Sequence, residues 1–105
     1  MELLVKKEVK GSTITFILEG ILDITTANVM DPYLAEIDSI EVLVIDLSQL
    51  EFLDSTGIGS LMNAIYLSQE KDFKIKLQGI DELTDQIFET VGLYQILKAM
   101  QGEVV

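Results

Sequence analysis

Residues 52–59 read Phe52-Leu53-Asp54-Ser55-Thr56-Gly57-Ile58-Gly59, and the segments on either side of them set the architecture of the chain. The run Val42–Leu47 before them is apolar, and Ile58–Leu67 after them has apolar residues at helical spacing. Ser55 is a favourable N-cap residue, because its oxygen can accept a hydrogen bond from the first helical turn. Each glycine in that turn costs about 0.5–1 kcal/mol relative to alanine. The sequence therefore predicts that a neighbouring element or a partner closely approaches the start of this helix.

Alternating segments predict a β-hairpin near the N-terminus. Leu3–Val9 and Thr13–Glu19 each alternate apolar and polar residues, and a short turn with Gly11 joins them. Val42–Leu47 is apolar at successive positions, which predicts a central strand covered on both faces. Asp46 is expected at the carboxyl end of that strand.

A helical pattern follows the hairpin, and Thr25 or Thr26 can cap it. Pro32 lies inside this pattern, so it must either kink the helix or restart it with Asp31 as the cap.

The C-terminal third predicts a strand, a helix and a final edge strand. Phe73, Ile75 and Leu77 alternate with lysines, and Asp81 then caps a third helix. The residues expected on the buried face of this helix are Leu83, Ile87 and Val91, and Gly92 ends it. We expect a short helical turn after it and an edge strand over about Leu97–Met100.

These elements predict an α/β fold as a single domain over residues 1–105. The sheet is expected to be mixed, with about five strands, an antiparallel edge hairpin and helices packed on it. Binding sites in such sheets collect at the carboxyl ends of the strands. Asp23 and Asp54-Ser55 follow successive predicted strands, so they form one site if those strands are neighbours.

The composition excludes several classes of active site. Among its 105 residues the chain has no histidine, cysteine, tryptophan or arginine. A Ser-His-Asp or Cys-His site therefore cannot be assembled, and zinc would have only carboxylate ligands. We expect a non-enzymatic protein without metal or cofactor.

No apolar run approaches the ~20 residues of a membrane span, and no signal-peptide pattern is present, so a soluble cytoplasmic protein is expected.

The charge distribution points away from nucleic acid and leaves two interpretations of the acidic surface. The net charge is −11, whereas binding to phosphate backbones needs a basic face. Between Gly11 and Glu70 there are ten acidic residues and no basic one. This surface either serves solubility or steers in a partner that has a basic docking face.

The hydroxyl groups at the helix start predict a modification site. Gly57-x-Gly59 is too short for a dinucleotide fingerprint or a P-loop and lacks the lysine. A free helix N-terminus attracts anions, and the phosphate can be attached to Ser55 itself, adding about −1.5 to −2 charges. Asp46 as a phosphoacceptor is disfavoured, because the first strand is not followed by the acidic pair that receiver domains need.

The motifs resemble those of the STAS family, and within it the stand-alone anti-sigma factor antagonists of bacterial partner-switching systems. The segments that carry this resemblance are Gly20-Ile21-Leu22-Asp23 with Thr26-Ala27, Val44-Ile45-Asp46-Leu47-Ser48, Phe52 to Gly59, and Val91-Gly92-Leu93. The block Asp54-Ser55-Thr56-Gly57-Ile58-Gly59 is the specific one. Because many relatives continue into a last helix beyond the point where this chain stops, that element is expected to be short or missing.

The resemblance implies a phosphorylation switch. In that family a kinase-type anti-sigma factor phosphorylates the serine matching Ser55, the unphosphorylated antagonist captures that kinase and frees the sigma factor, and a PP2C-type phosphatase resets it. The resemblance places the docking surface around Ser55 at Asp23, Asp54, Thr56 and Gly57, and we expect Ile58 and Gly59 to belong to it as well. The chain is expected to be monomeric when free. The alternative is a STAS module that is never phosphorylated, serving as a scaffold in a signalling complex or as a subunit of a transport system.

Overall fold

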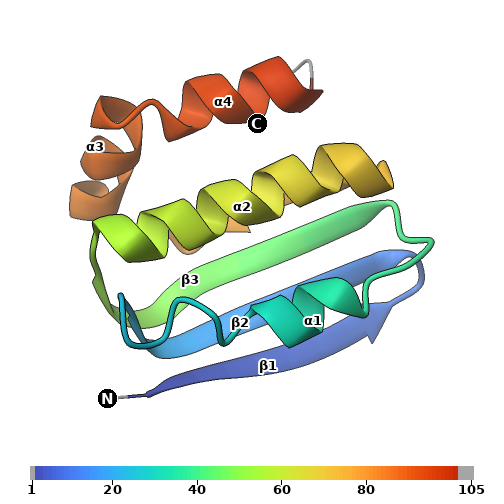
Figure 1. Ribbon diagram of the computed structural model, residues 1–105, viewed down its shortest axis with the longest axis horizontal. Coiled ribbons are helices and arrows are strands. Elements are labelled where there is room, and N and C mark those ends of the chain that lie inside the picture. The colour runs from blue at the N-terminus through green and yellow to red at the C-terminus, as the bar shows by residue number, and fades with distance from the viewer. Residues whose placement is uncertain (1, 102–105) are drawn as a thin grey trace.

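The computed structural model describes residues 2–101, whose strands form one four-stranded sheet in the order β1-β2-β3-β4 (Figure 1). The strands are β1 (Leu3–Lys10), β2 (Thr13–Leu22), β3 (Val42–Leu53) and β4 (Lys74–Gln78). β1 and β2 pair antiparallel, whereas β2–β3 and β3–β4 pair parallel. The predicted mixed sheet with an antiparallel edge hairpin is therefore confirmed. The expected number of about five strands was wrong.

The four helices of residues 2–101 all lie on one side of this sheet (Figure 1). They are α1 (Asp31–Ala35), α2 (Ser55–Lys71), α3 (Glu82–Thr90) and α4 (Leu93–Gln101), and α4 packs against α2 and α3. The sheet contributes Phe16, Leu18, Leu43, Ile45 and Ile75 to the core. Val42 and Val44 on the opposite face are only half-buried, so the prediction that both faces are covered was wrong.

The C-terminal edge strand expected over about Leu97–Met100 was also wrong, because these residues belong to helix α4. Leu93 and Leu97 are buried four positions apart, and the half-buried Ile96 and Met100 extend the same face. This spacing matches a helix and places one apolar face against α2. The last helix that was expected to be short or missing would follow Gln101 and falls outside the described residues.

The first helix is much shorter than its sequence pattern suggested. Hydrogen-bonded turns occupy residues 24–30, and α1 begins after Met30 with Pro32 in its first turn. Of the two threonines, Thr26 does not cap a helix: its hydroxyl donates to Ile21 O and accepts from Asp23 N. Such local bonds offer the backbone an alternative to helix. Pro32 does restart a helix, but Met30 rather than Asp31 occupies the cap position.

Strand β3 continues past its expected end. Asp46 lies in mid-strand, paired with Ile17 on one side and Gln78 on the other. Its carboxylate accepts from Ser48 N and Gln78 Nε2. Burial raises the pKa of Asp46, but these hydrogen bonds outweigh that effect and lower it overall. An ionised carboxylate is therefore tolerated within the strand, and β3 extends to Leu53.

Candidate functional site

The site lies where β2 and β3 end side by side. Leu22 and Leu53 are paired at the carboxyl ends of these parallel strands. Asp23 and Asp54 are the next residues along each chain segment, and Asp54 N donates to Leu22 O at 3.4 Å. The expectation that the two turns share one edge of the sheet, which depended on the strand order, is confirmed.

Asp54, not Ser55, caps helix α2. The Asp54 backbone is extended, and its Oδ1 accepts from Gly57 N at 2.9 Å. Ser55 is the first residue of the helix. The assignment of Ser55 as the cap was wrong because an aspartate one position earlier competes for the same N–H group, and both residue types are favourable caps. The Ser55 hydroxyl is consequently released from this structural role.

Ser55 and Thr56 present two exposed hydroxyl groups on the first turn of α2. Within residues 2–101 neither hydroxyl takes part in a hydrogen bond. Asp54, directly before them, is by contrast half-buried and hydrogen-bonded to Gly57 N. The free N–H groups of a helix start also stabilise negative charge placed there. The position can therefore both be reached by an enzyme and accommodate a phosphate.

The fold requires glycine at only one of the two glycine positions in this turn. A Cβ on Gly57 would lie 2.2 Å from Leu22 O and 2.8 Å from Leu53 Cδ1, so the end of β2 requires glycine there. A Cβ on Gly59 would meet nothing within 4 Å. Ile58, which the sequence analysis assigned to the docking surface, is buried and belongs to the core.

Asp23 organises its own turn. Its Oδ1 accepts from Thr25 N at 2.8 Å and from Thr25 Oγ1 at 2.6 Å. The side-chain hydrogen bond from Thr25 is the main reason that the pKa of Asp23 is lowered, so this carboxylate is ionised at neutral pH. Asp23 and Asp54 thus give the site two acidic groups, each fixed by a local hydrogen bond.

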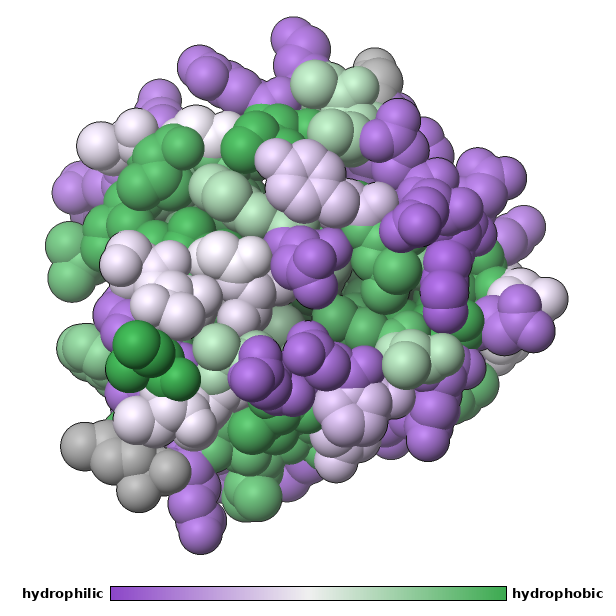
Figure 2. Space-filling model, in the orientation of Figure 1, coloured by the Kyte–Doolittle hydropathy of each residue, from purple (hydrophilic) through white to green (hydrophobic). Residues whose placement is uncertain are grey.

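The sequence analysis gave no role in the site to three nearby residues, Ile24, Phe52 and Ser60. Ile24 is 73% exposed on the turn after β2, and Phe52 is 53% exposed near the end of β3. Ser60 Oγ donates to Ala27 O at 3.0 Å and ties the two turns together. Figure 2 shows a near-neutral surface over the start of α2, with hydrophobic surface over α3 on one side and over the turn after β2 on the other. A large apolar residue beside a predicted turn is the signal that could have revealed Ile24 and Phe52.

The described part of the chain holds no group of three or more acidic side chains arranged to bind a metal ion. No helix between residues 2 and 101 combines the length and apolar character needed to cross a membrane.

The cap predicts a matched pair of stability effects. Asp54→Ala should lower the free energy of unfolding by about 1 kcal/mol, the usual cost of losing an N-cap. Asp54→Ser should retain most of that stability, because serine also caps well. Urea unfolding followed by circular dichroism measures both, and equal stability of Asp54→Ala and wild type would contradict the assigned cap.

The sequence matches the model of the STAS domain over residues 5–103, and the chain belongs to this family. It is 32% identical over 65 residues to the anti-sigma-B factor antagonist of Listeria monocytogenes, a match that covers 60% of this chain and only 57% of the relative. It is 23% identical over 88 residues to the anti-sigma-B factor antagonist of Staphylococcus aureus, covering 82% of each.

Solved structures share the fold. An anti-sigma factor antagonist from Mycobacterium paratuberculosis aligns with a TM-score of 0.73 and 25% identity, covering 90% of this chain and 81% of that one. Bacillus SpoIIAA in its phosphorylated form gives 0.68 and 17%, covering 88% and 85%. A sulfate transporter family protein from Wolinella succinogenes gives 0.75 and 16%, covering 87% and 75%. The fold alone therefore serves both antagonists and transporter-family proteins.

Proposed function

We propose that the chain is an anti-sigma factor antagonist whose binding is switched off by phosphorylation of Ser55. The unphosphorylated form binds a kinase-type anti-sigma factor and thereby releases the sigma factor. The kinase transfers the γ-phosphoryl group of ATP to Ser55 Oγ, leaving ADP, and a PP2C-type phosphatase hydrolyses the ester. The chain itself is a binding module and a substrate rather than an enzyme.

The observation that carries this proposal is the exposed Ser55 hydroxyl at the start of α2, left free because Asp54 caps the helix. A kinase needs a hydroxyl that it can reach, and most serines that cap helices are engaged with the backbone. The helix start also tolerates the added phosphate, since free N–H groups and the helix dipole favour negative charge.

The surroundings of Ser55 support a protein partner. Ile24, next to Asp23 in the chain, and Phe52, two residues before Asp54, are large apolar side chains exposed to solvent. Interfaces commonly combine such apolar anchors with polar groups that fix orientation. The ionised Asp23 carboxylate lies in a stretch without lysine, which favours a partner with a basic face.

The relatives named anti-sigma-B factor antagonist support this role over the alternatives. The likeness to a sulfate transporter family protein supports a second candidate, a STAS module that acts in a transport assembly without phosphorylation. The two candidates differ in one property, because only the first requires a free hydroxyl at Ser55.

A release assay tests the proposal. The unmodified chain is titrated into the complex of a kinase-type anti-sigma factor from the same genome with its sigma factor, and free sigma factor is measured by size-exclusion chromatography. We expect release at stoichiometric amounts and none with the phosphorylated chain. Absence of binding to every such kinase in the genome would overturn the proposal and favour the second candidate.

A further inference from the structure

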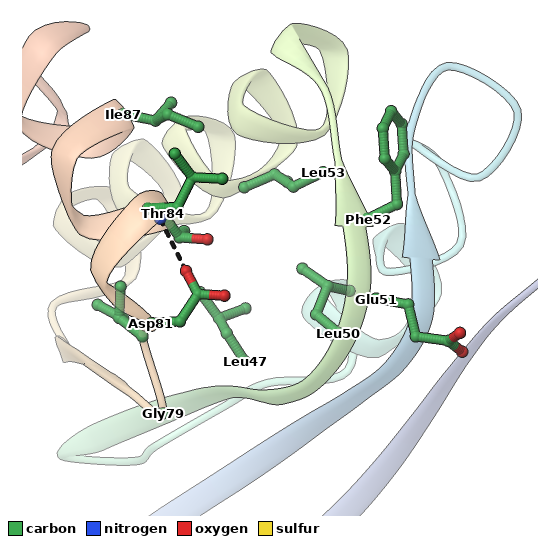
Figure 3. Close-up of a pocket in the computed structure, with 11 residues that line it drawn as sticks. Leu47, Leu50, Glu51, Phe52, Leu53, Gly79, Asp81, Thr84 and Ile87 are labelled. Atoms are coloured by element: carbon green, nitrogen blue, oxygen red, sulfur yellow. Dashed lines mark hydrogen bonds between the residues drawn. The ribbon is translucent and has the colours of Figure 1, made fainter.

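A groove beside the switch serine separates strand β3 from helix α3 (Figure 3). Strand β4 pairs with β3 only as far as Asp46, so Leu47–Leu53 has no strand partner on that side within the described residues. Helix α3 stands opposite this free edge, and the space between them has a volume of about 220 Å³.

Both walls of the groove carry apolar side chains. Leu47, Leu50 and Leu53 point from β3 toward α3, and Ile87 faces them from the helix (Figure 3). Leu83 lines the rim and is 67% exposed. The sequence predicted Leu83 and Val91 to be buried, which was wrong: Phe88 occupies the core position of α3, and both of these residues remain exposed. An exposed leucine beside an apolar cavity is a feature of binding surfaces.

The volume of the groove limits what can bind in it. Sites for small molecules commonly measure about 300–1,000 Å³, so 220 Å³ is too small for most of them. It suits one apolar side chain, the kind of anchor that supplies much of the binding energy of protein interfaces. An extended segment can also add to a free strand edge through its backbone.

The charges around the groove specify what flanks that side chain. The Asp81 carboxylate lies between the two walls, with Oδ1 accepting from Thr84 N at 2.8 Å (Figure 3). Helix α3 also carries Glu82, Asp85 and Glu89, and no basic residue occurs anywhere between Leu77 and Leu97. A partner segment that is complementary to these charges therefore carries basic residues on either side of its apolar residue.

We infer that this groove is a second contact for the kinase-type anti-sigma factor: it takes one apolar side chain of that partner, flanked by lysine or arginine. The inference rests on the proposed function, because the groove adjoins the same surface. Leu53 lines it and is followed directly by Asp54 and Ser55. Contact there adds affinity and selects among kinases, whereas Ser55 switches the affinity on and off.

Isothermal titration of the full chain with the kinase tests the inference. Thr84→Phe fills the groove, Leu83→Ser removes its apolar rim, and Asp81→Ser removes its charge while keeping a good helix cap. Leu4→Ser is the matched control, since Leu4 is 52% exposed and does not line the groove: it lies on strand β1, which β2 separates from β3. We expect Thr84→Phe to weaken binding about tenfold or more, Leu83→Ser by less, and Leu4→Ser to have no effect. Asp81→Ser should reduce the salt dependence of the affinity.

Ser55→Asp separates the possible results, and far-UV circular dichroism confirms that each variant is folded. If Leu83→Ser and Asp81→Ser bind as wild type while Ser55→Asp binds weakly, the groove is not a contact and the proposed function stands. If the unmodified chain fails to bind any kinase, the proposed function and this inference both fall. Loss of binding with Leu4→Ser equal to that with Leu83→Ser would also contradict a specific groove.

Discussion

Phosphorylation of Ser55 should lower the affinity for the kinase-type anti-sigma factor without changing the fold. The phosphate on Ser55 lies next to Asp54 in the chain, and binding of the kinase removes water from both groups. A like-charge pair at about 4 Å costs roughly 1 kcal/mol in water and about 4 kcal/mol at an effective dielectric constant of 20, so desolvation raises their repulsion by up to about 3 kcal/mol. Each 1.4 kcal/mol is a factor of ten in affinity, so this increase predicts a loss of up to about a hundredfold. The half-buried Asp54 and the absence of lysine between Gly11 and Glu70 favour the upper part of this range.

Two variants and one spectrum check this expectation. Ser55→Ala should bind the kinase as the unmodified chain does, whereas Ser55→Asp, with one added charge, should bind more weakly. Backbone chemical shifts should change at residues 22–27 and 52–60 alone, because the helix start accommodates the phosphate. Widespread shift changes in β1, β4 or α4 would instead indicate a rearrangement of the fold.

Gly57→Ala should be strongly destabilising. The added Cβ would lie 2.2 Å from Leu22 O, a backbone atom at the end of an ordered strand that cannot rotate away. Overpacking of this kind commonly costs about 1–3 kcal/mol, and more where the neighbour is backbone. In a domain of this size each 1 kcal/mol lowers Tm by about 4–8 °C, which differential scanning calorimetry resolves easily.

Gly59→Ala is the matched control in the same helical turn. Its Cβ would meet no atom within 4 Å, so the better helix propensity of alanine should raise the free energy of unfolding by up to about 1 kcal/mol. No neighbour within the described fold requires glycine at this position, so we assign Gly59 to the surface that the partner approaches. We therefore expect Gly59→Ala to weaken kinase binding. Destabilisation by Gly59→Ala equal to that by Gly57→Ala would contradict the two separate roles.

Much of the fold follows from periodicity and turn chemistry. The alternation of Leu3–Val9 and Thr13–Glu19 predicted the antiparallel hairpin, and Asp81 and Gly92 marked the limits of α3. Helix α4 was missed because the segment Leu97–Met100 is too short for its apolar spacing to distinguish a strand from a helix. Burial against α2 decides between them. Helix α1 was overextended because the bonds of Thr26 to Ile21 and Asp23 compete with helix formation.

The candidate site was predicted in outline and corrected in detail. The pairing of Leu22 with Leu53 brings Asp23 and Asp54 to one edge, as two successive strands ending in acids suggested. The choice between Asp54 and Ser55 as cap depends on the extended backbone of Asp54, which residue types alone do not determine. The groove beside α3 could not be predicted from the sequence. It forms because β3 continues beyond the end of its pairing with β4 and because Leu83 faces outward.

Site-resolved mass spectrometry tests the central claim, that Ser55 is the switch. The chain, its Ser55→Ala variant and a Thr56→Ala variant are incubated with the kinase-type anti-sigma factors of the same genome and ATP. The account predicts one phosphate on Ser55 in the wild type and in Thr56→Ala, and none in Ser55→Ala. Stoichiometric phosphate on Ser55→Ala, or none on the wild type with any of these kinases, would contradict it.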